Sequence, residues 1–170
     1  GRNISLLCVD SASVTAESVK NAVGEDDETV LVINADSYFE FNLSEAYSRH
    51  IINKNDVTII HTKQGYAKCS LCVVTEKAVI TEDDGLACLL KNYQFNVLKI
   101  QPGFVHLSDK HYGFIGGASG KVSEHQMYFS GDLRKHPDYE EILSFLNKHN
   151  IKPVFNKNRQ LNDFGGFIPL

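Results

Sequence analysis

The chain has 170 residues, 42% of them hydrophobic and 22% charged, a composition that fits one globular domain and argues against disorder or a fibrous repeat. Its formal net charge is −4 and its 17 Lys and Arg residues are scattered, so we expect no nucleic-acid partner. No apolar run approaches the roughly 20 residues of a membrane span, and the first eight residues lack the pattern of a signal peptide. We therefore predict a cytoplasmic protein with no membrane partner.

The predicted elements alternate between apolar, β-branched strands and amphipathic helices. The clearest helical stripes run through Leu86, Leu90 and Tyr93 and through Ile142 and Leu146, at the spacing of an apolar helix face. Pro137 suits the first turn of the second of these helices, and Asn150 can end it. In chain order we predict strands at 4–9, 30–34, 57–61, 71–75, 78–81, 97–100, 127–130 and 152–155, and helices at 15–23, 44–52, 86–93 and 139–146.

The same order of elements occurs twice in the second half of the chain. From Leu71 the order is strand, turn, strand, helix and strand as far as Ile100, and from Lys121 it is the same as far as Phe155. Strands that alternate with helices in this way indicate an α/β fold.

A polar loop with an aromatic residue beside glycine follows each of three predicted strands, at 63–66, 110–113 and 163–166. Repeated units that share a core bring equivalent loops to one end of a domain, so we expect these loops to line one cavity. Their side chains can bind a small polar metabolite or can satisfy loop backbone, and the sequence leaves both open. The candidate ligand-binding residues are Lys63, Gln64, Lys68, Ser70, Tyr112, Gly117, Ser119 and Asp163.

The glycine-rich segment 116–121 (GGASGK) resembles a phosphate-binding loop only superficially. Val122 follows the lysine where Ser or Thr is needed, and a predicted strand follows where a helix should begin. We expect a tight turn with close backbone approach instead.

The four cysteines, Cys8, Cys69, Cys72 and Cys88, lie in apolar stretches and are expected to be buried free thiols. Cys69 and Cys72 enter a predicted strand, where residues three apart point to opposite faces, so we expect no metal site at this pair. We also expect no cofactor. Cys69 alone is a candidate nucleophile because Lys68 lies beside it and a nearby cation favours the thiolate. A base would have to come from His61, His106, His111 or His136, and a plain core thiol is the alternative.

Four motifs resemble those of an uncharacterised bacterial family assigned to the guanidine-modifying enzymes, or penteins. They are KQGYAKCS (63–70), YGFIGGASG (112–120), GDLRKHPDY (131–139) and DFGGFIPL (163–170). The likeness covers 57–170 of a predicted single domain, 1–170, and the chain is shorter than a typical member. The resemblance implies an α/β propeller of ββαβ units around a central pocket.

The sequence departs from active penteins at the positions that carry their chemistry. In those enzymes a cysteine near the C-terminus attacks the guanidine carbon, but 165–169 (GGFIP) holds none. Ala118 and Ser119 stand where the resemblance implies an acidic residue, and Lys68 and Cys69 lie where the histidine-bearing strand starts. Without the thiolate the standard reaction has no support.

We therefore expect a protein that binds a small polar metabolite in a central pocket, without Cys-dependent guanidine chemistry. One alternative is a divergent hydrolase or transferase that uses Cys69, and another is a structural or interaction module. A shortened propeller leaves strand edges uncovered, so the aromatic stretch 38–41 (YFEF) and the first strands predict a homodimer.

Overall fold

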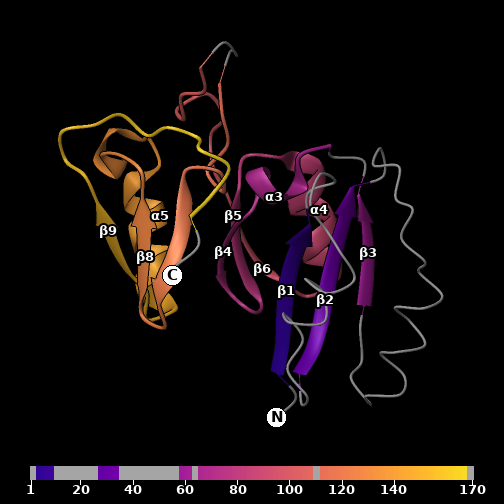
Figure 1. Ribbon diagram of the computed structural model, residues 1–170. Coiled ribbons are helices and arrows are strands. Elements are labelled where there is room, and N and C mark those ends of the chain that lie inside the picture. Colours follow the sequence, from indigo (N-terminus) through magenta and orange to yellow (C-terminus); the bar gives the residue numbers. More distant parts are fainter. Residues whose placement is uncertain (1–2, 10–26, 35–57, 63–64, 109–111, 168–170) are drawn as a thin grey trace. The chain divides into compact units, whose positions relative to one another are not determined.

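The computed structural model describes residues 3–9, 27–34, 58–62, 65–108 and 112–167, which divide into an N-terminal unit, 1–67, and a C-terminal unit, 68–170 (Figure 1). Each unit is taken by itself below. Several predictions fall outside the described residues: the helices at 15–23 and 44–52, the aromatic stretch 38–41, and Lys63, Gln64 and His111.

The N-terminal unit holds a parallel sheet in the order β1-β2-β3, with β1 at Asn3–Val9, β2 at Asp27–Asn34 and β3 at Thr58–Thr62. In register, Leu6 lies opposite Val30 and Val30 lies opposite Thr58. The near-continuous apolar runs of β1 and β2 are typical of parallel strands. The three strands predicted in this half of the chain are confirmed.

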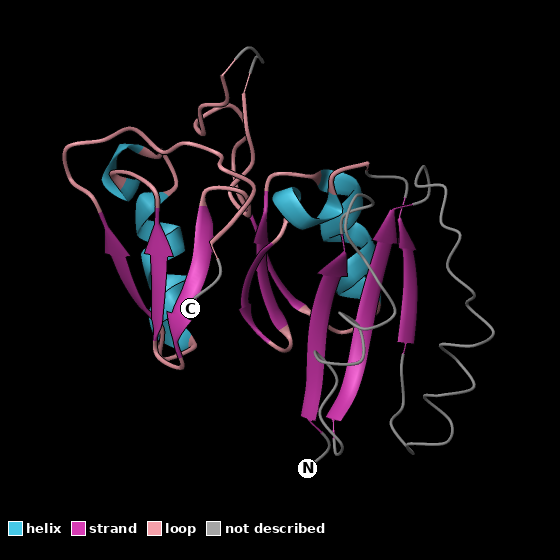
Figure 2. Cartoon of the chain, viewed as in Figure 1, coloured by secondary structure: helices cyan, strands magenta, loops and turns pink. Residues whose placement is uncertain are grey.

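The C-terminal unit repeats one arrangement twice (Figure 2). In the first copy, β4 (Cys72–Thr75) pairs antiparallel with β5 (Ala78–Thr81), and the helix α4 (Asp84–Asn92) leads to β6 (Asn96–Lys99), parallel to β5. The second copy has β7 (Ser119–Ser123), β8 (Gln126–Phe129), α5 (Tyr139–Lys148) and β9 (Lys152–Phe155) in the same relation. Two short helices, α3 (Ala67–Ser70) and the 3₁₀ helix η1 (Leu133–Lys135), complete the described elements.

This arrangement confirms the internal repeat and the α/β fold class. The antiparallel pair forms across a tight turn, whereas the parallel pair needs a crossover, and the helix provides it. Among the described residues, no helix has the length and apolar character that a membrane span requires.

The two long helices begin and end for local reasons. The Asp83 side chain accepts a hydrogen bond of 2.7 Å from the Leu86 N–H and so caps α4. Asn150, with a φ of 58°, follows the C-terminal end of α5, as predicted. Pro137 was expected inside the first turn of α5, but that expectation is wrong because the N-cap is Asp138. The Asp138 N–H donates to Nδ1 of His136, at 3.1 Å, and Pro137 lies two residues before Tyr139, the first residue of the helix.

One buried cluster spans both copies of the repeat. β4 lies beside β7, and the Cys72 thiol donates to the Met127 sulfur at 3.3 Å. The connection between β6 and β7 adds Ile115 and Ala118, both fully buried. The two copies therefore share one core, which holds the residues of 112–120 in place.

Candidate functional site

Three of the segments singled out in the sequence meet at Gly117. The Gly117 N–H donates to the carbonyl oxygen of Cys69, at 2.9 Å. The Gly117 carbonyl oxygen accepts from the N–H groups of Phe164 and Gly166, each at 2.9 Å. Segments 68–71, 113–119 and 163–166 are therefore joined by main-chain bonds at one residue of the β6–β7 connection. We call this place the junction.

Glycine is required at the junction by close approach. A Cβ atom on Gly116 would overlap the carbonyl oxygens of Cys69 and Leu71, and one on Gly117 would overlap the carboxylate of Asp163. The predicted tight turn with close backbone approach is confirmed for this segment. β7 follows it directly, so the helix that a phosphate-binding loop needs is replaced by a strand.

Asp163 ties the C-terminal segment to the β6–β7 connection. Its Oδ2 accepts from the Phe114 N–H and its Oδ1 from the Gly165 N–H, both at 2.9 Å, and its own N–H donates to the His106 carbonyl at 2.8 Å. A carboxylate has about four lone-pair positions, so each oxygen keeps capacity for one further donor. Asp163 is thus a positioning residue that can also contact a ligand.

Glu82 is the titratable group that the sequence reasoning missed. Its Oε1 accepts from the Ile115 N–H at 2.8 Å, while Oε2 has no hydrogen-bond partner among the described residues. Glu82 is only 6% exposed. Burial raises the pKa of Glu82 to about 8, and the charge of Asp163 adds to this, while the N–H groups of Glu82 and Ile115 and the Lys99 charge oppose it. An available signal was its place directly after the fully buried strand β5, at the head of an acidic run.

Two serines at the junction are buried. Ser70 is fully buried and its Oγ has no partner among the described residues. Ser119 is 5% exposed and its hydroxyl forms a hydrogen bond with the Cys72 thiol. Burial raises the pKa of Cys72 to about 12, so this thiol stays neutral and is no nucleophile.

The cysteines depart from the predicted pattern in two ways. Cys69 lies in α3 and not in a strand, because a helical turn ends at Ser70 before β4 begins, so the argument from alternating strand faces does not apply. Cys88 is exposed on α4, so its expected burial is wrong, since its position on the helix lies outside the buried stripe. Cys69, Cys72 and Cys88 are free thiols, as predicted, and Cys69 is half-buried.

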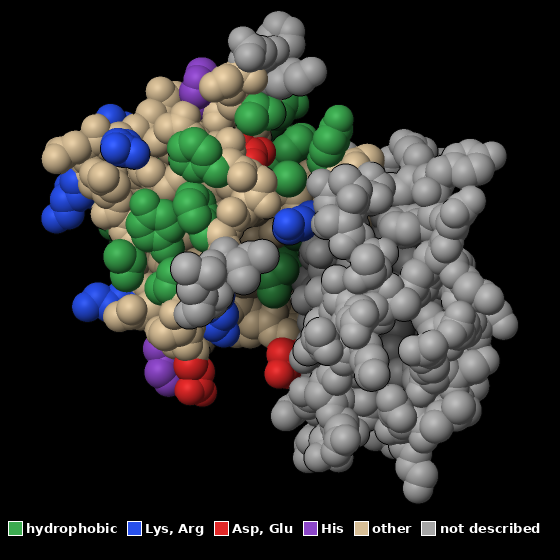
Figure 3. Space-filling view, in the orientation of Figure 1, with side chains coloured by type: hydrophobic (Ala, Val, Ile, Leu, Met, Phe, Trp, Pro, Cys, Tyr) green, Lys and Arg blue, Asp and Glu red, His purple; other side chains and the backbone are tan. Residues whose placement is uncertain are grey.

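Other residues of the three segments and their neighbours are more exposed. Lys68 is half-buried on α3, and Tyr112 is 43% exposed with its ring 6.1 Å from that of Phe114. Phe164 is 65% exposed, and its ring lies 6.0 Å from that of Phe167. Figure 3 shows hydrophobic side chains gathered on one face of the C-terminal unit.

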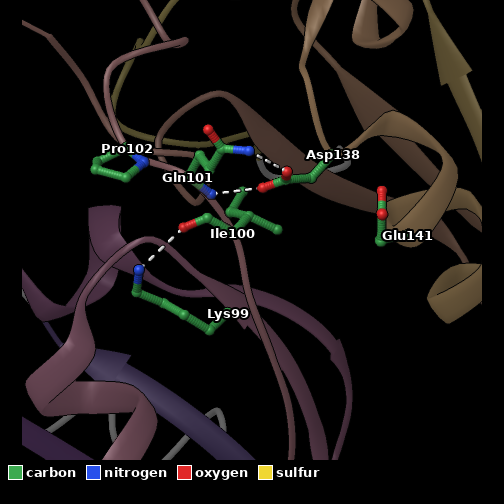
Figure 4. Close-up of a pocket in the computed structure, with 6 residues that line it drawn as sticks. All are labelled: Lys99, Ile100, Gln101, Pro102, Asp138 and Glu141. Atoms are coloured by element: carbon green, nitrogen blue, oxygen red, sulfur yellow. Dashed lines mark hydrogen bonds between the residues drawn. The ribbon is translucent and has the colours of Figure 1, made fainter.

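A separate hollow of about 300 Å³ opens between the end of β6 and the start of α5 (Figure 4). The Gln101 N–H and Nε2 donate to the two Asp138 carboxylate oxygens, at 2.6 and 2.7 Å, and Lys99 donates to the Ile100 carbonyl at 3.2 Å and pairs with Asp84. Pro102 and Glu141 complete its lining. None of the predicted site residues lines this hollow, and most of its polar groups are paired within the protein.

The donor set does not resemble a metal centre. Within 65–108 and 112–167, no three His, Cys, Asp or Glu side chains gather in a group able to hold a metal ion. The junction offers hydrogen bonding from buried oxygens, and the aromatic side chains of Tyr112 and Phe164 in adjoining segments are exposed.

Comparison with known proteins places the chain in a family but adds no activity. No curated protein and no solved structure matches it. The sequence model of one family does match, over residues 25–168, which include β2, β3 and every described element of the C-terminal unit. The chain therefore belongs to the family of unknown function DUF6873.

Proposed function

We propose that this protein binds a small polar metabolite at the junction of 68–71, 113–119 and 163–166, without Cys-dependent guanidine chemistry. The observation that carries the proposal is a pair of buried oxygens without partners among the described residues, Ser70 Oγ and Glu82 Oε2. Native proteins leave few such atoms, because each costs roughly 1–3 kcal/mol. A bound molecule with polar groups would satisfy them.

Both atoms belong to residues that border the same loop. Ser70 follows Cys69, whose carbonyl binds Gly117, and Glu82 binds the neighbouring Ile115. The β4–β5 hairpin also relates them: Cys72 pairs with Ile80, and Ser70 and Glu82 each lie two residues beyond that pair, at the same end of the hairpin. Asp163, with hydrogen-bonding capacity to spare, borders the loop on Phe114.

The absence of guanidine chemistry in this proposal rests on side chains that cannot perform it. The segment 165–169 contains no cysteine, and Ala118, fully buried, offers no charge to a guanidinium. The repeated strand–strand–helix–strand unit and the four motifs support a pentein-like propeller with a central pocket, which we include in the proposal.

Thermal shift measurements with a panel of amino acids, amides and small carboxylic acids at millimolar concentration test the binding. A compound that stabilises the wild type should lose most of its effect in Ser70→Ala and Lys68→Gln, while the variant Lys148→Gln, at an exposed position of α5, should behave as wild type. Binding unaffected by Ser70→Ala, or chemical-shift changes confined to residues away from 113–119 and 163–166, would contradict the proposal.

The chemistry has its own test. Arginine and agmatine incubated with pure protein should yield no ammonia, citrulline or amidino-transfer product. Turnover abolished by Cys69→Ala and retained in Cys88→Ser would favour the hydrolase or transferase that uses Cys69.

A further inference from the structure

Two carboxyl groups from distant parts of the C-terminal unit hold neighbouring amides of one loop. Asp163 accepts from the Phe114 N–H at 2.9 Å, and Glu82 accepts from the Ile115 N–H at 2.8 Å. The two carboxyl groups therefore hold consecutive amides of one loop, and the charge of Asp163 acts on Glu82. Two carboxyl groups that interact in this way cannot both ionise freely.

The groups that face Glu82 make its ionised form costly. Asp163 contributes a negative charge from the C-terminal segment, Lys99 on β6 contributes an opposing positive charge, and Cys72 on β4 is a neutral thiol. Oε2 has no N–H or O–H donor among the described residues. With the pKa raised to about 8, Glu82 is protonated at neutral pH, and only one negative charge is present at the loop.

The loop itself can respond to a change in this charge. Asp163 is followed by Gly165 and Gly166, which have φ values of 83° and 103° and so form a backbone segment with few steric restraints. Two main-chain bonds to the Gly117 carbonyl, from Phe164 and Gly166, hold this segment to the loop. Displacement of Asp163 would strain both bonds.

We propose that Glu82 is a proton switch for the 113–119 loop: the protonated carboxyl closes the loop onto the C-terminal segment, and loss of the proton loosens the contact. On ionisation the proton leaves to solvent, and the new charge on Glu82 repels Asp163 across the Phe114–Ile115 peptide. The 163–166 segment then separates from Gly117. The switch operates in the ligand-free protein, so it does not depend on the proposed function.

A pH titration of the carboxyl carbon of Glu82 by NMR, on the full chain, tests the first step. The midpoint should lie near 8 in the wild type. Asp163→Asn should lower it by about one pH unit, because a like charge is removed, and Lys99→Gln should raise it. Lys99 is partly exposed, so its variant should fold and give the direction even if Asp163→Asn does not.

Hydrogen exchange tests the loosening. Protection factors of 113–119, taken relative to those of α5, should fall by up to about tenfold per pH unit as the pH rises toward the midpoint in the wild type, and should level off above it. Glu82→Gln, which keeps an acceptor for the Ile115 N–H but cannot ionise, should show no such fall. A Glu82 midpoint near 4.5, or an equal fall in protection in wild type and Glu82→Gln, overturns the switch.

Discussion

The carboxylate of Asp163 occupies the space that a Cβ atom on Gly117 would need. The same glycine donates its N–H to Cys69 and accepts through its carbonyl from Phe164 and Gly166. Its backbone does not lie among the positive-φ residues. Glycine is therefore needed at 117 for space and not for backbone conformation, which makes the position sensitive even to alanine.

Gly117→Ala should destabilise the C-terminal unit by roughly 1–3 kcal/mol, because Asp163 is held by two hydrogen bonds and cannot move away freely. Urea unfolding followed by circular dichroism measures this. Gly85→Ala, in the first turn of α4, serves as the control, since alanine favours a helix and the Cβ meets only the Asp83 side chain, at 3.2 Å. An unchanged midpoint for Gly117→Ala would show that the close approach is relieved at little cost.

Stability should fall with rising pH on account of Glu82. Its folded pKa, about 8, lies above its ordinary value of 4.5, so the folded state binds the proton more tightly than the unfolded state. This stabilisation is fully present below pH 4.5. Between pH 4.5 and pH 8 the free energy of unfolding falls by about 1.4 kcal/mol per pH unit, and above pH 8 the loss is complete. In Glu82→Gln this contribution should vanish, while Glu140→Gln, exposed on α5, should keep the wild-type slope. If the free energy of unfolding depended on pH in the same way in wild type and in Glu82→Gln, the raised pKa of Glu82 would be ruled out.

Two buried serines should respond oppositely to removal of their hydroxyl groups. Ser70 Oγ has no partner among the described residues, so Ser70→Ala should be neutral or stabilise the protein by up to about 1 kcal/mol. Ser130 Oγ donates to the Asn162 carbonyl at 2.7 Å and accepts from its N–H at 2.8 Å, so Ser130→Ala should cost about 1–2 kcal/mol. Equilibrium unfolding of both variants gives the comparison, and a loss for Ser70→Ala as large as that for Ser130→Ala would indicate a partner for Ser70.

His136 should contribute to acid denaturation. It is 2% exposed, its Nδ1 accepts from the Asp138 N–H, and its ring lies edge-on to Phe104 at 5.3 Å. Burial lowers its pKa below 6.5, opposed by the Asp138 charge and the Gln101 backbone, so its stabilisation is present above pH 6.5 and is lost as the pH falls through the lowered value. The difference in unfolding free energy between wild type and His136→Asn should therefore narrow in acid. A difference independent of pH would mean that His136 is not neutral in the folded state.

Thiol labelling should follow burial. Cys88 should react first with a maleimide, Cys69 more slowly, and Cys72 only on unfolding, because its thiol is buried against Met127 and its pKa is raised to about 12. Peptide mapping by mass spectrometry assigns the sites. Labelling of Cys72 at the rate of Cys88 under native conditions would contradict the packing of β4.

The repeat was predictable because it depends on local patterns. The apolar stripes of α4 and α5, with Leu86, Leu90, Ile142 and Leu146 buried, are set by helical spacing alone. The prediction for Pro137 is wrong because α5 begins two residues later, after Asp138, whose carboxylate binds Gln101, 37 residues away, a contact that local spacing does not reveal.

The site was harder to predict, because it depends on contacts between residues far apart in the chain. Asp163 and Gly117 stood out as polar and glycine-rich motifs, and the structure joins them. Glu82 did not stand out, because its burial and its bond to Ile115, 33 residues away, are set by packing and cannot be read from the run of acidic residues around it. The prediction that Cys69 and Cys72 both enter a strand is wrong, because Cys69 lies in the short helix α3, which ends before β4 begins.

The buried contact between Cys72 of β4 and Met127 of β8 has a consequence for how this protein can evolve. Each copy of the repeat completes its interior with side chains from the other, as Ile80 and Phe129 do within the common cluster. Neither copy alone could bury its apolar face, so the pair should melt in a single transition and resist separation into halves. Substitutions that enlarge a side chain in one copy are then tolerated only when a facing residue in the other becomes smaller, and the two copies are bound to change together.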